Sequence, residues 1–515
     1  MKILENILYP LILIVMLLPA LQKELELIPE KELQGDFVPA EKPVFTWSSW
    51  YRGDYQAQLE GFLNDHIGFN PNLIRLNNQI DYSLFNYIHA DGVVKGKGGQ
   101  LYEYDYIRSY LGIDYLGEKY IDKKIRRMKF VQDYLKDSLD IDLIFVLEPG
   151  KASFYPEYIP DRYMKYKSSV TNYTTILEKA QQYGVRYLDL NAWFRQLKNT
   201  VAYPMYGQFG IHWSPYGMSF AADTLLRLIE ETRGIHMREA VVDSFEVEPL
   251  ARVPDYDIAT AMNLICRLKD SEPLAYPVYR FGERSDTLDY PMVLVVGDSY
   301  FWNIINPGIP KEVFGNEAYW YFGHLVYPDF YYKPTYVSDL DLKEEVEKQD
   351  VILLMTTERF LYKFDWKFID NLYALYGVTS EYDKVFEYQS QILMNNEWVA
   401  SIISKARLRN IPVEEMLYLD ARYIYKEQEP VNYAVYYGIS EQEELIRRDP
   451  EWMTLIEKKA DEKNIGIDEM LRIDAEYMLS TSNPDAYEIY RQIEQNKNIL
   501  RGDSLRLEQI NKAAT

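Results

Sequence analysis

Cysteine and histidine are scarce in this sequence, and their scarcity excludes several kinds of site. Of 515 residues, one is cysteine (Cys266) and five are histidine. A single cysteine can form neither an internal disulfide nor a thiolate zinc site. The histidines form no His-Glu-x-x-His pair and no other close metal-ligand spacing. The sequence therefore predicts no disulfide framework and no metal centre.

Positive charge is also in short supply. The chain has 56 Lys and Arg against 79 Asp and Glu, a formal net charge of −23 at pH 7. Such a chain lacks the basic field that neutralises nucleic-acid phosphates, so we expect no nucleic-acid partner. Neither a Walker loop nor a Gly-x-Gly-x-x-Gly turn occurs, and no soluble cofactor is predicted.

Apolar and aromatic residues, by contrast, are abundant. The hydrophobic share of 47% and the charged share of 26% are typical of a folded globular protein. At roughly 150 residues per domain, the length suggests two to four units. The 47 tyrosines offer flat rings with polar tips, which suit sugar binding, although most such rings are core or half-buried surface.

The most apolar stretch is N-terminal. Asn6–Gln22 carries no charge, follows Lys2, and precedes an acidic-leaning segment. No clear small-x-small cleavage site is present near Pro19 and Ala20. These features favour an uncleaved signal anchor over a removed signal peptide at residues 1–22. By the positive-inside tendency, we expect the body to be periplasmic or otherwise extracytoplasmic and anchored to the inner membrane.

The middle of the chain has the pattern of an α/β domain. Residues 23–45 are polar and contain proline, which indicates a linker. Within residues 46–385, short apolar runs occur at Asp142–Leu147, Arg186–Leu190, Val293–Val296 and Val351–Met355. Helical stretches lie between them, at Tyr120–Ser138, Tyr173–Tyr183 and Ser219–Thr232. This alternation predicts a doubly wound parallel sheet flanked by helices, with ligands beyond the carboxyl ends of the strands.

The last part of the chain, residues 386–515, is helical, charged and internally repeated. Glu397–Ile424 matches Glu451–Met478, and each copy is predicted to form two helices joined by Asn-Ile-Pro or Asn-Ile-Gly. No catalytic constellation repeats with it, and two copies are fewer than a solenoid normally needs. We therefore expect a helical module that docks on the main domain or on a partner.

One predicted strand runs directly into a serine. In Val293–Tyr300 (VLVVGDSY), Ser299 follows a buried apolar run and can project its hydroxyl into the crevice above the sheet. Gly297 permits a tight turn, and an exposed backbone N–H there is a possible oxyanion donor. Gly-Asp-Ser is a short motif of low specificity, and the Gly-x-Ser-x-Gly elbow is absent.

A serine nucleophile needs a base, and His212 is the best candidate. It lies in Gln208–Gly217 (QFGIHWSPYG), a loop-like segment before the helix predicted from Ser219. Loops above a sheet commonly carry such groups. A lone histidine in a loop is more often structural, so the assignment depends on a wider pattern.

That pattern is a family resemblance. The order of His-Trp first and Gly-Asp-Ser second resembles the alginate O-acetyltransferase group of SGNH hydrolase-like, DHHW-type proteins of the cell envelope. Further segments occur in the family's order across roughly residues 55–375: Val93–Tyr102, Glu148–Pro160, Asp257–Leu264 and Thr356–Phe360. The resemblance implies an SGNH-like fold, with Ser299 as nucleophile and His212 as general base.

The resemblance does not supply the third member of a catalytic triad. The family's aspartate, two residues before the histidine, corresponds to Gly210 here. In a triad that carboxylate orients the imidazole and stabilises the imidazolium. Another carboxylate takes the role, a Ser–His dyad suffices, or the protein is a binding module. Asp298 and Glu358 are candidate substitutes because they belong to the matching motifs.

Four residues are candidates for substrate contact. Lys151 either contacts an anionic sugar or is an exposed loop lysine. Trp213 either stacks on a sugar or packs beneath its loop. Arg359 either lines the crevice or pairs with Glu358 at the surface. Tyr300, next to the serine, is the fourth.

The predicted reaction is two-step acetyl transfer. His212 takes the proton of Ser299, Ser299 is acylated, and a hydroxyl of an exported polysaccharide accepts the acetyl group. The resemblance implies a membrane-bound O-acyltransferase (MBOAT-type) partner that supplies the donor. Two alternatives stay open: a carbohydrate esterase with the same residues, and a non-catalytic glycan-binding or scaffolding protein, motivated by Gly210.

Overall fold

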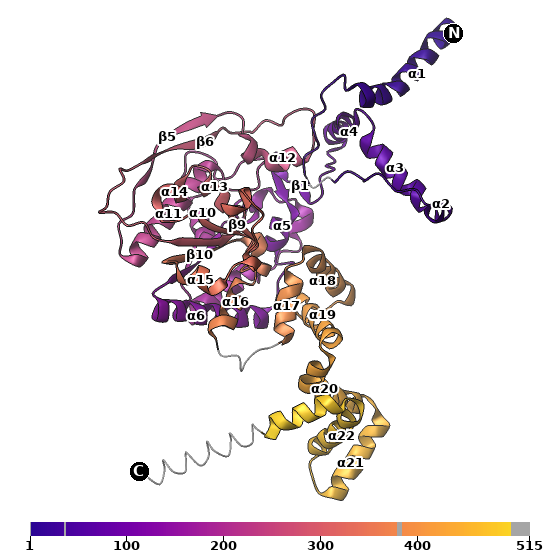
Figure 1. The fold of residues 1–515 in the computed structure, drawn as a ribbon, viewed down its shortest axis with the longest axis vertical. Coiled ribbons are helices and arrows are strands. Elements are labelled where there is room, and N and C mark those ends of the chain that lie inside the picture. The colour runs from indigo at the N-terminus through magenta and orange to yellow at the C-terminus, as the bar shows by residue number, and fades with distance from the viewer. Residues whose placement is uncertain (1, 36–37, 378–383, 496–515) are drawn as a thin grey trace. The chain divides into compact units, whose positions relative to one another are not determined.

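The computed structural model describes residues 2–35, 38–377 and 384–495. The chain divides into two compact units, residues 1–378 and 379–515. Each unit is described by itself, with helices and strands labelled as in Figure 1.

A six-stranded sheet lies at the centre of the first unit. Its strands, in spatial order, are β4 (Tyr187–Asp189), β3 (Asp142–Glu148), β10 (Val351–Thr357), β7 (Val293–Gly297), β8 (Ala318–Tyr321) and β9 (Leu325–Tyr327). All neighbours pair in parallel except β9, which is antiparallel to β8 at the edge. Every residue of β3, β7 and β10 is buried, as expected for apolar strands covered on both faces.

Helices cover both faces of this sheet (Figure 1). One face carries α10 (Leu190–Leu197), α11 (Pro215–Arg233), α13 (Phe301–Ile305) and α14 (Ile309–Val313). The other carries α6 (Glu118–Leu139), α15 (Leu342–Glu347) and α16 (Phe368–Tyr376), with α9 (Asn172–Tyr183) packed on α6. The predicted α/β sheet flanked by helices is confirmed, and the four predicted strands are β3, β4, β7 and β10.

Smaller elements surround the sheet. Two antiparallel pairs are β1 (Val93–Lys95) with β2 (Leu101–Glu103), and β5 (Ala240–Glu248) with β6 (Leu274–Phe281). The remaining helices of this unit are α1 (Lys2–Leu25), α2 (Trp47–Arg52), α3 (Asp54–His66), α4 (Asn70–Phe85), α5 (Tyr104–Leu111), α7 (Lys151–Phe154), α8 (Asp161–Met164) and α12 (Asp257–Ala261). Two 3-10 turns adjoin the site, η3 (Val253–Tyr256) and η6 (Glu358–Lys363).

Helix α1 contains the segment for which the sequence predicts a signal anchor or signal peptide. Within the described residues, no helix has both the length and the apolar character needed to cross a membrane. The signal anchor predicted for residues 1–22 is therefore unsupported.

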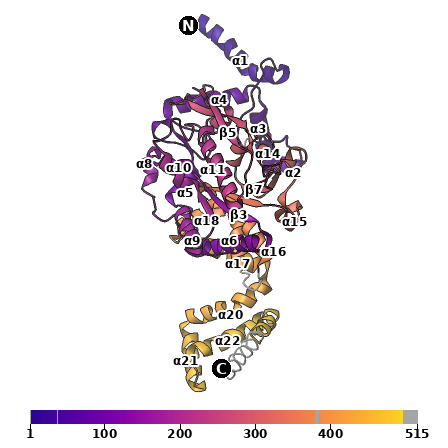
Figure 2. The same ribbon diagram turned by 90° about the vertical axis from the view of Figure 1, so that its left-hand side faces the viewer.

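The second unit is helical in its described part. Its helices are α17 (Lys384–Leu393), α18 (Asn396–Arg409), α19 (Val413–Gln428), α20 (Pro430–Arg448), α21 (Pro450–Lys463) and α22 (Ile467–Ser482). The helix pairs α18–α19 and α21–α22 correspond to the two sequence repeats, and each contains an equivalent ion pair of 2.6 Å, Lys405–Asp420 and Lys459–Asp474. Figure 2 shows α20, α21 and α22 gathered together, around an apolar core of their own.

Candidate active site

Ser299 stands where β7 leaves the sheet. A Cβ on Gly297, the last residue of β7, would approach the carbonyl oxygen of Met355 on β10 to 3.0 Å, so this position must stay small. Asp298 and Tyr300 are fully buried, whereas Ser299 between them is half-buried. Ser299 is thus the side chain of this turn that is accessible at the carboxyl ends of the strands, where ligands bind in sheets of this kind.

The imidazole of His212 joins Ser299 to a carboxylate. Its Nε2 lies 2.8 Å from Ser299 Oγ, and its Nδ1 lies 3.1 Å from Asp257 Oδ2. The three groups come from the loop before α11, the start of α12 and the end of β7. This order of serine, imidazole and carboxylate is the one found in catalytic triads.

Asp257 is fixed by further hydrogen bonds. Its Oδ1 accepts the backbone N–H groups of Ile211 at 2.9 Å and Ile258 at 2.8 Å. Burial alone would raise the pKa of Asp257, but hydrogen bonds from His212 and from these two N–H groups outweigh it and lower the pKa. The carboxylate therefore stays ionised and orients the His212 ring through its contact with Nδ1.

Gly210 cannot carry the carboxylate that the family motif places there. A Cβ on Gly210 would lie 2.6 Å from the carbonyl oxygen of Asp255 in the η3 segment. Asp257 follows Asp255 by two residues and presents its carboxylate to His212 instead. Asp257 belongs to a segment that carries the family resemblance, but its distance along the chain from His212 gave no reason to select it.

Asp298, the first substitute suggested by the sequence, has other partners. Its Oδ2 accepts the N–H of Thr357 at 2.9 Å and the hydroxyl of Thr357 at 2.6 Å, and its Oδ1 accepts the N–H of Tyr300 at 3.1 Å. Asp298 therefore ties the serine turn to the end of β10. Burial and then the charge of the neighbouring Asp298 raise the pKa of the buried Glu148 well above its ordinary value.

Glu358, the second substitute, also points elsewhere. Its carboxylate accepts hydrogen bonds from Ser153 Oγ and, at 3.4 Å, from Asn191 Nδ2. Burial raises the pKa of Glu358. The carboxylate is one of the groups that fasten η6 to α7 and α10, and its hydrogen bonds do not include His212.

Arg359 does not pair with Glu358 at the surface. The guanidinium is buried, forms an ion pair with Glu103, and lies 4.8 Å from the ring centre of Tyr106. Burial raises the pKa of Glu103 above its ordinary value. The charges of Arg359 and His212 lower this pKa, whereas the charge of Asp257 raises it. The Arg359–Glu103 pair is therefore a neighbour of the hydrogen-bonded chain.

Lys151 is neither exposed nor available to a sugar. Its side chain is buried, and its ammonium donates to the carbonyl oxygens of Gly207 at 2.8 Å, Gln208 at 3.0 Å and Gly210 at 2.8 Å. These three carbonyls belong to the loop that carries His212. Lys151 therefore stabilises the loop that carries His212 from within the protein interior.

Trp213 and Tyr300 are also interior residues. Trp213 is fully buried, with its ring centre 5.0 Å from that of Tyr300, which excludes stacking on a sugar. The hydroxyl of Tyr300 donates to the carbonyl oxygen of Ile211 at 3.1 Å and accepts from Tyr106 at 3.0 Å. Both residues support the backbone segment that contains His212.

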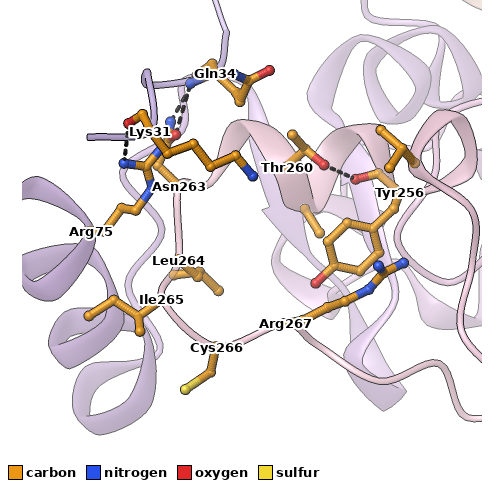
Figure 3. A pocket seen from close by; sticks show the side chains of 12 residues that line it. Lys31, Gln34, Arg75, Tyr256, Thr260, Asn263, Leu264, Ile265, Cys266 and Arg267 are labelled. Carbon is orange, nitrogen blue, oxygen red and sulfur yellow. Dashed lines mark hydrogen bonds between the residues drawn. The ribbon is translucent and has the colours of Figure 1, made fainter. Parts of the chain in front are cut away.

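A separate cavity of about 390 Å³ is lined by Arg75, Thr260 and Arg267, among other residues (Figure 3). Three cationic residues line it, but Arg75 donates to the carbonyl oxygens of Lys31 and Glu32, and Arg267 lies 4.6 Å from the ring centre of Tyr256. None of the three residues of the hydrogen-bonded chain lines this cavity. Its two arginines fasten neighbouring segments together.

Comparison with known proteins identifies the domain that contains this site. Residues 93–303 match the family model described as SGNH hydrolase-like domain, acetyltransferase AlgX. This part of the chain is similar to SGNH hydrolase-like domains of the alginate O-acetyltransferase type. The resemblance drawn from the sequence motifs is thereby confirmed. The matched range contains Ser299, His212 and Asp257.

Several solved structures are similar to this chain. The O-acetyltransferase domain of Pseudomonas putida AlgJ is 19% identical and aligns over 59% of this chain and 99% of its own, with a TM-score of 0.36. Pseudomonas aeruginosa AlgX is 13% identical over 57% and 69%, with a TM-score of 0.35. Bacillus cereus PatB1 with a sulfonyl adduct is 11% identical over 48% and 91%, with a TM-score of 0.30. No curated protein matches the chain.

Proposed function

We propose that this protein transfers an acetyl group to hydroxyls of an exported polysaccharide outside the cytoplasm, through an acyl-enzyme on Ser299. The observation that carries the proposal is the continuous hydrogen bonding from Ser299 through His212 to Asp257. Its position at the carboxyl edge of the sheet, within an SGNH acetyltransferase-like domain, supports the same reading.

In the first half-reaction, Ser299 Oγ attacks the carbonyl carbon of the acyl donor while His212 Nε2 takes the hydroxyl proton. Asp257 stabilises the imidazolium that forms. Among the described residues, none accepts a hydrogen bond from the Ser299 N–H, so this group is free to donate to the oxyanion. The donor's leaving group departs with the proton from His212, and the acetyl ester of Ser299 remains.

In the second half-reaction, His212 takes the proton of the acceptor hydroxyl, whose oxygen attacks the acetyl carbon. The bond to Ser299 Oγ breaks, and the proton returns from His212 to Ser299. The donor is supplied, in this proposal, by an MBOAT-type membrane partner.

Hydrolysis by the same residues is the second candidate. The side chains of His212 and Asp257 are 20% and 34% exposed, so water reaches the base. An esterase and a transferase then differ only in the hydroxyl that accepts the acetyl group. The contact between Asp257 and His212, although position 210 is glycine, favours the two catalytic candidates over the non-catalytic alternative.

Product analysis separates these candidates. The full chain is incubated with p-nitrophenyl acetate, with and without polysaccharide, and acetate and acetylated sugar are measured by mass spectrometry beside Ser299→Ala. Acetylated sugar that depends on Ser299 supports transfer. Acetate as the sole product with every polysaccharide supports the esterase, and no turnover beyond that of Ser299→Ala overturns both.

A further inference from the structure

A group of aromatic side chains begins next to Ser299, on the neighbouring strand β8 and on helix α13. Strand β8 pairs in parallel with β7, and Tyr321 at the end of β8 is the partner of Gly297 at the end of β7. Trp302 follows Ser299 by three residues, and its N–H donates to the Ser299 carbonyl oxygen at 3.2 Å. Because neighbouring parallel strands end at the same edge of a sheet, Tyr321 and Trp302 belong to the edge that carries Ser299.

The rings continue from Trp302 to strand β9, where Tyr327 pairs with Tyr319 of β8, and to the residues that follow β9. Trp302 lies 5.6 Å from Tyr321, 5.2 Å from Tyr327 and 5.9 Å from Phe330, centre to centre. Tyr331 lies 4.4 Å from Phe330 and 5.6 Å from Tyr327. These separations are typical of aromatic pairs in contact. We call these five residues the aromatic strip.

The aromatic strip becomes more exposed along its length. Trp302, Tyr321, Tyr327 and Phe330 are half-buried, and Tyr331 is 66% exposed. Trp302, Tyr321 and Tyr327 pack against the margin of the buried core and keep part of their surface exposed. Contiguous aromatic surface beside a reactive group is typical of a binding site. The indole N–H and the phenol hydroxyls also give these rings polar edges.

The chemistry of the aromatic strip selects its occupant. Flat rings with polar edges match sugars, whose C–H faces are apolar and whose hydroxyls seek hydrogen bonds. Nucleobases also stack on aromatic rings, but they require a positively charged groove along the backbone. The chain's net charge of −23 disfavours that partner.

We propose that the aromatic strip binds the acceptor glycan by stacking on successive sugar rings, and that it presents a sugar hydroxyl to acylated Ser299. This inference rests on the proposed function. The aromatic strip acts in the second half-reaction, in which the acetyl bond to Ser299 Oγ breaks, a bond to the sugar oxygen forms, and His212 carries the proton from sugar to serine. Its loss weakens glycan binding and leaves acylation of Ser299 intact.

Two adjacent tyrosines provide a matched pair of variants. Tyr331 belongs to the aromatic strip, whereas Tyr332 is 89% exposed and shares no ring contact with it. Because both side chains are largely exposed, Tyr331→Ala and Tyr332→Ala leave the buried core untouched. The full chain and both variants are tested for binding to immobilised cello-, chito- and oligo-uronate hexamers. The p-nitrophenol burst on acylation is measured in parallel.

The expected result is that at least one hexamer binds the unmodified protein and Tyr332→Ala equally. Tyr331→Ala binds it about 2- to 10-fold more weakly, the factor that one aromatic contact provides. The burst is equal in all three proteins. Equal binding by both variants, or no hexamer bound by the unmodified protein, overturns the inference.

The burst separates the two proposals. A lower burst in Tyr331→Ala with unchanged glycan binding assigns the aromatic strip to the acyl donor and overturns the inference. If no protein gives a burst but Tyr331→Ala alone binds glycan weakly, the proposed acyl-enzyme fails while the aromatic strip stands as a glycan site.

Discussion

Replacing Lys151 by methionine tests how the loop of His212 is held. Methionine keeps the length of the side chain and removes the ammonium that donates to three carbonyls. Gln208 O also accepts the N–H of Leu101 at 3.0 Å, so Gly207 and Gly210 are the residues whose carbonyls lose their donor. Each buried acceptor that is left without a partner costs about 1–3 kcal/mol, so the loss of the donor to both carbonyls would lower the free energy of unfolding by roughly 2–6 kcal/mol.

The substitution also removes a buried charge. Burial lowers the pKa of Lys151 to about 7 from its ordinary value of 10.5, which corresponds to about 5 kcal/mol of charge-burial cost below pH 7. The two effects are similar in size and opposite in sign. We therefore expect Lys151→Met to fold, with a midpoint of thermal unfolding close to that of the unmodified protein at pH 6.

The rate of Ser299 acylation should nevertheless fall. His212 follows the released carbonyls by two residues, and a misplacement of about 1 Å at a catalytic group costs up to about 100-fold. The assay is the p-nitrophenol burst, with Lys165→Met as a control because Lys165 is exposed and lies over Tyr166. An unchanged burst in Lys151→Met, or loss of cooperative unfolding, would refute this reasoning.

Three further predictions concern neighbouring carboxylates and the glycine. Asp257→Asn should lower the acylation rate by up to about 10⁴-fold, whereas Glu358→Gln should retain most of it, as stopped-flow measurement of the burst will show. Gly210→Ala and Gly210→Asp should both be destabilised in urea, because a Cβ meets the carbonyl oxygen of Asp255 at 2.6 Å; a more active Gly210→Asp would contradict this. Burial raises the pKa of Asp255 to about 7, so the folded protein holds a proton that the unfolded chain releases between about pH 4 and 7. The free energy of unfolding therefore falls by up to roughly 4 kcal/mol as pH rises through this window. The stability of Asp255→Asn relative to the unmodified protein should accordingly be higher at pH 8 than at pH 5.

The sequence predicts strands best where a strand is buried along its whole length. The apolar runs of β3, β7 and β10 could be predicted as strands because both faces of these strands are covered. Strands β8 and β9 were missed because they are short and rich in tyrosine, which gives neither an apolar run nor an alternating pattern. The hairpin of β5 and β6 was also missed. Helix α11 begins at Pro215, earlier than predicted, because Ser214 caps it.

At the site, the motifs selected Ser299 and His212, which the structure brings into contact. They could not select Asp257, because its contact with His212 depends on how η3 packs against Gly210. The burial of Lys151 could not be predicted for a similar reason. Its pattern in the sequence is that of an exposed turn, and the carbonyls that receive its ammonium come from a loop more than 50 residues away.

Covalent trapping tests whether Ser299 forms an acyl-enzyme with His212 as its base. The full chain is incubated with p-nitrophenyl acetate, quenched in acid and analysed by intact mass and peptide mapping, beside Ser299→Ala, His212→Ala and Asp257→Asn. One acetyl group is expected on Ser299 in the unmodified protein, none in Ser299→Ala or His212→Ala, and slow formation in Asp257→Asn. An unmodified protein that acquires no acetyl group on Ser299, or that acquires it equally fast without His212, would contradict this expectation.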